Sequence, residues 1–256
     1  MKINKGKTAK ARRMLIYGEP GVGKSTLASR FPNPVFINLE DGIRDLECDS
    51  TDLVRSYREF QDMITTGLPS TDYATVVVDT VDWLEKLLMH EVASKANKAT
   101  IEDIGFGKGY EALAKMWQSV FAGLGSLWNQ GRHIVLTCHE KIDKFSDPEG
   151  DGYNYYRPAL HRTGSQCVSE WCDEVLFCKH QRITKKADDG KRSVALAGER
   201  IIVCQNMQSI EAKNRLGMPS EVPMAIESFY AYLTKNEISK AAAVVANDSV
   251  ASEITF

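Results

Sequence analysis

The residues best suited to chemistry lie near the N-terminus, in a segment with the spacing G-x-x-x-x-G-K-[ST]. Its residues are Gly18-Glu19-Pro20-Gly21-Val22-Gly23-Lys24-Ser25. A glycine-rich turn lets consecutive backbone N–H groups point at one anion, and a following helix adds the positive end of its dipole. In this motif the lysine reaches the β- and γ-phosphates and the serine holds Mg²⁺. We therefore expect residues 18–26, including Thr26, to bind ATP and Mg²⁺.

An apolar strand that ends in an acid predicts the second metal ligand. Val76, Val77 and Val78 precede Asp79. In phosphate-loop enzymes an acid in this place lies beside the Mg²⁺ ion. We expect Asp79 to contact the metal through water. Asp82 follows closely, and we expect it to begin the next helix instead.

Hydrolysis also requires a group that activates or orients water. In many phosphate-loop ATPases a glutamate directly follows the metal aspartate, but here Thr80 follows Asp79. A second acidic pair, Glu40 and Asp41, ends the apolar run 34–39. Since ligands bind at the carboxyl ends of parallel strands, Glu40 is the expected catalytic acid and Asp41 is its alternative.

His139 ends another apolar run, 133–138. A polar side chain in that place can touch the γ-phosphate and report its presence to the segment beyond it. A histidine at the end of a strand can also be purely structural, so both interpretations stay open.

Short apolar runs and helical patterns alternate along the chain, as in an α/β fold with buried parallel strands. We expect strands at 14–17, 34–39, 74–79, 133–138, 174–179, 193–197 and 199–204, and helices at about 24–31, 55–66, 81–98, 108–129, 164–172 and 224–233. Residues 140–163 are polar and predict a long loop or small excursion. The turn at 188–191 predicts a hairpin. The expected fold is a mostly parallel sheet flanked by helices, with a C-terminal antiparallel extension.

Composition limits the class of protein. The 256 residues are 43% hydrophobic and 26% charged, with a net charge of −2, so the chain as a whole is no electrostatic nucleic-acid binder. No apolar run approaches the ~18 residues that a membrane span needs. The six cysteines include no C-x-x-C pair, which favours reduced thiols in a cytoplasmic protein. We expect a basic tail at 1–12, one domain at 13–233 and a C-terminal tail at 234–256.

Together these residues resemble the RecA-type ATPase core over about residues 12–233. In that family the catalytic glutamate ends the strand after the phosphate loop, as Glu40 does, and the metal aspartate precedes Ser or Thr, as Asp79 precedes Thr80. The γ-phosphate sensor is usually a glutamine, whereas this chain has His139. More narrowly, the chain resembles phage-encoded RecA-core ATP-binding proteins of the Sak type, which act in recombination or single-strand annealing.

The resemblance implies a site shared between subunits. RecA-type ATPases supply two basic residues from a neighbouring subunit in a Lys-x-Lys pattern, and Lys213-Asn214-Arg215 is similar to it. Such cations stabilise transition-state charge, as an arginine finger does. A homo-oligomer follows from this interpretation, and a solvated basic turn is its alternative.

The resemblance also implies contact with single-stranded DNA, because the loop after the sensor binds DNA in the RecA family. The expected contacts here are Lys144, Tyr155, Tyr156, Arg157 and Arg162, with Lys108 as a second candidate in the segment 105–110. Aromatic rings stack on bases while cations contact phosphates. Four acids in the same segment, Asp143, Asp147, Glu149 and Asp151, weaken the electrostatic argument.

We therefore expect a DNA-dependent ATPase of phage-type recombination, working in the host bacterial cytoplasm with a single-strand-binding or annealing protein. One alternative is an AAA+-like loader or helicase motor, which needs a helical lid after the core. Another is a non-catalytic nucleotide-gated adaptor, which would bind ATP without turnover.

Overall fold

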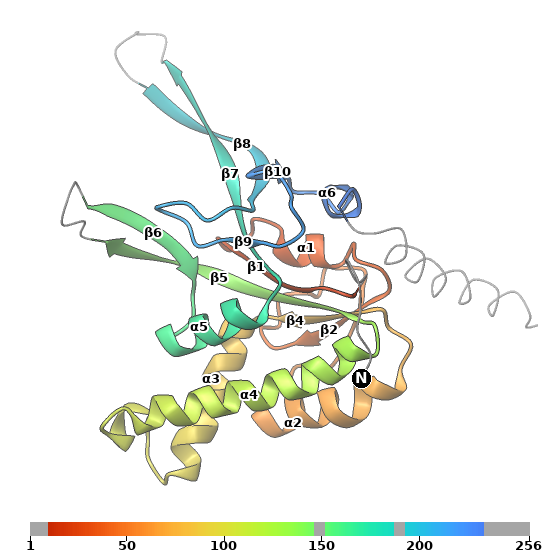
Figure 1. The fold of residues 1–256 in the computed structure, drawn as a ribbon, viewed down its shortest axis with the longest axis vertical. Coiled ribbons are helices and arrows are strands. Elements are labelled where there is room, and N and C mark those ends of the chain that lie inside the picture. Colours follow the sequence, from red (N-terminus) through yellow and green to blue (C-terminus); the bar gives the residue numbers. More distant parts are fainter. Residues whose placement is uncertain (1–9, 146–151, 187–192, 233–256) are drawn as a thin grey trace, which may run out of the picture.

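One ten-stranded sheet organises the part of the chain that the computed structural model describes, residues 10–145, 152–186 and 193–232 (Figure 1). Its strands are β1 (Arg13–Gly18), β2 (Pro34–Asn38), β3 (Asp49–Ser50), β4 (Thr75–Asp79), β5 (His133–Phe145), β6 (Tyr153–Pro158), β7 (Glu174–Lys186), β8 (Ser193–Val203), β9 (Lys213–Asn214) and β10 (Glu221–Pro223). Most of both expected tails lies outside the described residues, so the division into tails and one domain stays a prediction.

The strand order is β10-β8-β7-β1-β5-β4-β2-β3, with β6 paired to β5 and β9 to β7. The pairs from β7 to β3 are parallel, whereas β6, β8, β9 and β10 pair in the antiparallel sense. The expected class, a mostly parallel α/β sheet with an antiparallel extension, is confirmed.

Strand β5 lies between β1 and β4, and this order fixes where the site forms. Gly18 at the end of β1 pairs with His139 of β5, and Asn38 at the end of β2 pairs with Asp79 at the end of β4. The carboxyl ends of four parallel strands therefore meet at one edge of the sheet, where α/β folds bind their ligands.

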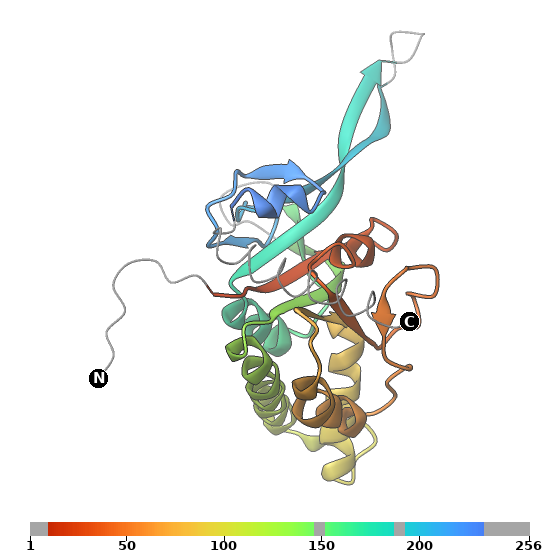
Figure 2. The same cartoon turned by 90° about the vertical axis from the view of Figure 1, so that its right-hand side faces the viewer.

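Helices cover the sheet on two faces. On one face lie α2 (Tyr57–Asp62), α3 (Val81–Lys95), α4 (Lys108–Asn129) and α5 (Arg162–Trp171), and on the other α1 (Lys24–Ala28) and α6 (Glu227–Tyr230) (Figures 1 and 2). A π-helical turn (Met63–Gly67) and two 3₁₀ turns (Leu68–Ser70, Glu102–Ile104) complete the helical segments. A hydrophobic core lies on each face of the sheet, and the side chains of β1 alternate between the two. Leu15 and Tyr17 face the helices α2 to α5, whereas Met14 and Ile16 face α1 and α6.

Two strands run further than their apolar runs. β5 continues through Phe145 and pairs with β6, so the described residues 140–145 and 153–158 form a small paired excursion rather than a long loop, the two possibilities expected here. β7 continues to Lys186 and projects with β8 beyond the rest of the fold (Figure 2). The extension of β5 was missed because its residues 140–145 are mostly polar and form no apolar run. The turn at 188–191, from which a hairpin was expected, lies outside the described residues, but the expected pairing of the strands on either side of it is present as β7 and β8.

The two strands expected at 193–197 and 199–204 are one strand, β8. Gly198 interrupts the apolar pattern between them. The β7–β8 register shifts at the same level, between His180 and Arg182. A bulge of this kind bends a strand without ending it, which explains why the sequence suggested two strands.

Gly164 of α5 supports a close contact between three helices. A Cβ at this position would overlap the Oε1 atom of Glu85 on α3 and lie 2.8 Å from the Nε1 atom of Trp117 on α4. Gly164→Ala should therefore lower the free energy of unfolding by about 2 kcal/mol, since overpacking a well-filled core forces side chains and backbone apart. Urea denaturation of the purified protein measures the change.

Gly125→Ala is the matched control for Gly164→Ala. Gly125 lies inside α4, and a Cβ there meets no atom within 4 Å. Alanine should leave stability unchanged or raise it by about 0.5–1 kcal/mol, because glycine weakens a helix interior. Equal stability of the two variants would show that α5 does not need the glycine.

Candidate active site

The phosphate loop joins the end of β1 to the start of α1. Gly21 has φ of 78° and Gly23 has φ of 105°, a left-handed conformation that side-chain-bearing residues rarely adopt. Gly18 meets another constraint, because a Cβ there would overlap the carbonyl oxygen of Cys178 on β7. The other residues expected to bind nucleotide complete the same turn and the first turn of α1, namely Glu19, Pro20, Val22, Lys24, Ser25 and Thr26.

Lys24 is buried, and its side chain turns back across the loop. Its Nζ atom donates hydrogen bonds to the carbonyl oxygens of Gly18 at 3.0 Å and Glu19 at 2.9 Å. Burial lowers the pKa of Lys24, because poorly solvated surroundings disfavour the charged form. A bound polyphosphate would supply the missing counter-charge, which fits the role expected of this lysine.

Three oxygen-bearing side chains converge beside the loop. Ser25 Oγ lies 3.0 Å from Oδ2 and 3.2 Å from Oδ1 of Asp79, and the Thr137 hydroxyl donates to Oδ1 of the same carboxylate. Burial raises the pKa of Asp79. The structure thus brings the two expected metal ligands together from α1 and β4, and adds Thr137 from β5 as a support that the sequence did not single out.

The donor set fits Mg²⁺, which prefers oxygen ligands and keeps several waters. The described part of the chain holds no group of three or more His, Cys, Asp or Glu side chains able to bind a metal ion. Ser25 and Asp79 would therefore hold the ion together with phosphate oxygens and water. Bound there, Mg²⁺ would neutralise phosphate charge during hydrolysis.

His139 stands between two carboxylates. Its Nδ1 atom lies 3.0 Å from Asp82 Oδ2, its backbone N–H donates to Asp82 Oδ1 at 3.2 Å, and its Nε2 atom lies 3.5 Å from Glu40 Oε1. The hydrogen bond to Asp82 raises the pKa of His139. The imidazole is thus held in place and biased toward its cationic form, which suits contact with a γ-phosphate.

The two acids after β2 have different surroundings. Glu40 faces His139 at the edge of the sheet, with 29% of its side chain exposed. Asp41 has a left-handed backbone, with φ of 63°, and its carboxylate is bound by Arg44. The geometry therefore favours Glu40 over Asp41 as the acid that faces the phosphate site.

A family model described as an AAA domain matches residues 10–216. The chain belongs to the AAA domain family. With a complete phosphate loop between β1 and α1, this member is an ATP-binding protein of the P-loop ATPase class.

Among solved structures, this AAA domain protein is similar to the KaiC-like protein PH0186 from the hyperthermophilic archaeon Pyrococcus horikoshii OT3. The TM-score is 0.44 at 16% identity, over 80% of this chain and 84% of that chain. No curated protein sequence matches the chain. No helix in the described ranges of the AAA domain protein is long and apolar enough to cross a membrane.

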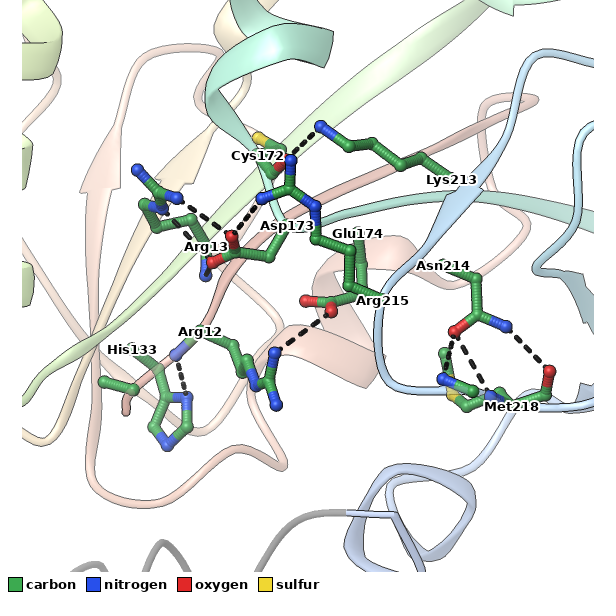
Figure 3. Close-up of polar contacts among 12 residues, drawn as sticks. Arg12, Arg13, His133, Cys172, Asp173, Glu174, Lys213, Asn214, Arg215 and Met218 are labelled. Carbon is green, nitrogen blue, oxygen red and sulfur yellow. Dashed lines mark hydrogen bonds and ion pairs between the residues drawn. The ribbon is translucent and has the colours of Figure 1, made fainter. Parts of the chain in front are cut away.

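Lys213 and Arg215 lie far from the phosphate loop of their own chain. Lys213 pairs with Val175 near the start of β7, the opposite edge of the sheet from Gly18. Its Nζ atom donates to the carbonyl oxygens that end α5, Ser169 at 2.8 Å and Cys172 at 2.7 Å (Figure 3). These contacts give Lys213 a structural role within the subunit, as a cation at a helix C-terminus.

Arg215 joins an ion-pair group at the same edge. It bonds to Asp173 at 3.0 Å, and Arg13 holds the same carboxylate through two nitrogens (Figure 3). More than half of the Arg215 side chain stays exposed. Neither basic residue can reach the phosphate loop of its own subunit from this edge, so their expected action in a neighbouring subunit stays a prediction.

The expected DNA contacts divide into exposed and engaged side chains. Lys108, Lys144 and Arg162 are exposed, and Tyr155 is partly buried. Arg157 is bound to Asp143 across the β5–β6 hairpin, and Tyr156 packs against Phe177 with ring centroids 5.3 Å apart. Arg157 and Tyr156 therefore hold the hairpin in place, while the exposed lysines remain available to a ligand.

Asp82 is the residue at this edge of the sheet whose contact with His139 the sequence did not reveal. It begins α3, as expected, but is also buried and bonded to His139. The available signal was its spacing, because a residue three positions after Asp79 lies in the first turn of the helix, beside the end of β4.

Asp82→Asn should lower the pKa of His139. The Asp82 carboxylate is the largest influence that raises the pKa of His139, so its loss should lower that pKa, although the charge of Glu40 still opposes the effect of burial. The protonated fraction of His139 should then disappear at lower pH than in the wild type. NMR titration of the ring protons, assigned with His139→Gln, measures both values.

Glu91→Gln is the control for Asp82→Asn, since Glu91 lies on the same helix but pairs with Lys95. It should leave the titration of His139 unchanged. An unchanged pKa in the Asp82→Asn protein would contradict the assignment.

Proposed function

We propose that this AAA domain protein is a DNA-stimulated ATPase that acts in phage-type recombination or single-strand annealing. The observation that carries the proposal is the continuity of β5. Its first half lies in the core sheet, His139 stands at the phosphate edge, and residues 140–145 form the hairpin with β6 (Figure 1). One strand thus joins the γ-phosphate contact to the expected DNA element.

The β5–β6 hairpin carries the side chains that a single strand requires. Lys141 and Lys144 are exposed, and Phe145 is 49% exposed with its ring centroid 5.1 Å from that of Tyr153. Aromatic rings can stack on bases of any sequence, while lysines contact the phosphates. Of the four acids in this segment, Asp143 is bound by Arg157, so its charge is compensated, whereas Asp147, Glu149 and Asp151 lie outside the described residues.

A second connection runs through α3. Glu85, one helical turn after Asp82, is buried and accepts hydrogen bonds from the His161 backbone N–H at 2.6 Å and from Trp117 Nε1 at 3.4 Å. The ring of His161 stacks on Tyr110, with centroids 4.0 Å apart. The helix that holds His139 through Asp82 therefore also holds the segment after the hairpin.

Tyr110 places the segment 105–110 beside this connection. Phe106 at its tip is fully exposed and has φ of 50°, between Gly105 at 71° and Gly107 at 72°. The two glycines adopt positive φ at no steric cost, but Phe106 does so at an energetic cost and keeps its apolar ring in solvent. Backbone strain of this kind in a non-glycine residue is concentrated at functional sites. We assign Phe106 and Lys108 to the DNA surface together with the hairpin.

The chemistry follows from the residues at the phosphate edge. Lys24 and His139 would hold the γ-phosphate, and Glu40 would orient the attacking water. Ser25 and Asp79 would hold Mg²⁺ against the phosphates. Because β5 carries both His139 and the hairpin, DNA on the hairpin would favour the strand position that hydrolysis needs.

Assembly and location complete the proposal. Arg215 remains accessible at the edge opposite the phosphate loop, so a neighbouring subunit could receive it at its own site. We propose a homo-oligomer with such shared sites, acting in the host cytoplasm beside a single-strand-binding or annealing protein. The alternative adaptor function differs in one respect, because it predicts ATP binding without turnover.

ATP turnover of the full chain should rise when oligo(dT) is added. Lys24→Ala and Asp79→Asn should each lower it by roughly 100-fold or more with or without DNA, because both remove groups that stabilise phosphate charge. Turnover per subunit should also rise with protein concentration if sites are shared. A phosphate-release assay measures all three.

Lys144→Glu separates DNA contact from chemistry in the same assay. It should reduce the stimulation by DNA and leave DNA-free turnover unchanged, whereas Arg58→Glu, an exposed change on α2, should affect neither. Full stimulation of the Lys144→Glu protein would remove the hairpin from the DNA surface. Unchanged turnover in Lys24→Ala or Asp79→Asn would overturn the site, and ATP binding without any turnover would favour the adaptor.

A further inference from the structure

A basic residue from the antiparallel extension lies against the phosphate loop. Arg200 of β8 pairs with His180 of β7, two residues beyond Cys178, which pairs with Gly18 of β1. Its guanidinium is so close to the loop that a Cβ at Gly23 would lie 3.0 Å from Nη1. Gly23 is the left-handed residue directly before Lys24, so the cation stands at the turn that must face phosphate.

The backbone of Arg200 is fixed while its side chain stays open to solvent. Its carbonyl oxygen accepts a hydrogen bond from the Met224 N–H at 3.0 Å, beside the β8–β10 pairing. The Arg200 side chain is exposed. Met224 also approaches the loop, since its Cε atom would lie 3.8 Å from a Cβ at Gly23.

Two acids on neighbouring segments pair with other side chains. The Glu19 carboxylate lies 4.0 Å from His180 Nε2, and the Glu221 carboxylate lies 3.5 Å from Lys179 Nζ. Among the side chains that the structure describes, no carboxylate forms an ion pair with Arg200. A guanidinium that lies against an anion-binding turn, with no ion pair to a described carboxylate, is complementary to a further negative charge at that turn.

We propose that Arg200 is a second cation of the nucleotide site and binds the polyphosphate of ATP in the same subunit. Lys24 approaches from the inside of the loop, where it is bonded to Gly18 and Glu19, and Arg200 lies against Gly23. A guanidinium can grip two phosphate oxygens at once, which an ammonium cannot. The proposal rests on nucleotide binding at the loop and is independent of DNA stimulation.

In this proposal the antiparallel extension contributes a phosphate-binding side chain to the nucleotide site. β8 is separated from β1 by β7, and it carries Arg200 to the loop only because the β7–β8 pairing sets its register. A DNA phosphate is the other anion that an exposed arginine can bind. Contact with the loop itself, rather than with the hairpin, favours the nucleotide.

Calorimetric titration of the full chain with Mg·ATP and Mg·ADP, without DNA, tests the proposal. Arg200→Ala should weaken Mg·ATP binding by about tenfold or more, the usual effect of losing a charge-assisted hydrogen bond. Arg200→Lys should recover part of the loss, since it keeps the charge but not the fork. Arg58→Ala should bind as the wild type does, and the melting temperature without nucleotide should not change in any variant.

Equal Mg·ATP affinity in Arg200→Ala and wild type would overturn the proposal while leaving DNA-stimulated turnover possible. So would a loss confined to binding of a fluorescent oligo(dT), because Arg200 would then belong to the DNA surface. A loss for Mg·ATP but not Mg·ADP would support contact with the γ-phosphate, and an equal loss for both would support contact with the phosphates they share. Failure of the wild type to bind Mg·ATP would remove the nucleotide site and this proposal together.

Discussion

The pairing of β1 with β5 is the constraint on which the rest of the site depends. Its register puts His139 directly beside Gly18, where the phosphate loop begins. β5 also pairs with β4, and the register of that pair places Thr137 beside Asp79. Asp79 in turn contacts Ser25 at the start of α1. A shift of one residue would turn each of these side chains to the opposite face of the sheet.

Two buried carboxyl groups on α3 connect the sheet to the helices that cover it. Asp82 and Glu85 lie one turn apart, and each bonds to a different element, Asp82 to β5 and Glu85 to the start of α5. Burial raises the pKa of Glu85 to about 7, so its protonation changes near neutral pH. Such groups are costly to bury unless they are bonded, which makes the arrangement around them specific.

The core and the phosphate loop could be predicted from the sequence because their signals are local. β1, β2 and β4 are short apolar runs, and the 108–129 helix has a clear apolar stripe, so all four appear within a residue or so of the expected places. The position of Glu40 followed from a general property of parallel sheets. The Asp82–His139 bond did not, because it joins residues 57 apart and depends on strand order.

The contacts of the antiparallel extension could not be predicted from the sequence either, because they too depend on strand pairing. The hairpin of β5 and β6 has no hydrophobic period, and the contact of Arg200 with Gly23 depends on the register of β8 against β7, which joins residues far apart in the sequence. Likewise, Lys213 and Arg215 had the right residue types for a shared site, but the sequence could not show that they also hold α5 and Asp173.

The central claim is that β5 transmits the state of the phosphate site to the hairpin. Hydrogen–deuterium exchange of the hairpin, with and without a non-hydrolysable Mg·ATP analogue, tests it most directly. The account predicts slower exchange at 141–145 and 153–157 in the wild type when the analogue binds, and no such change in His139→Ala at saturating analogue. Equal protection in both proteins, or none in the wild type, would contradict it.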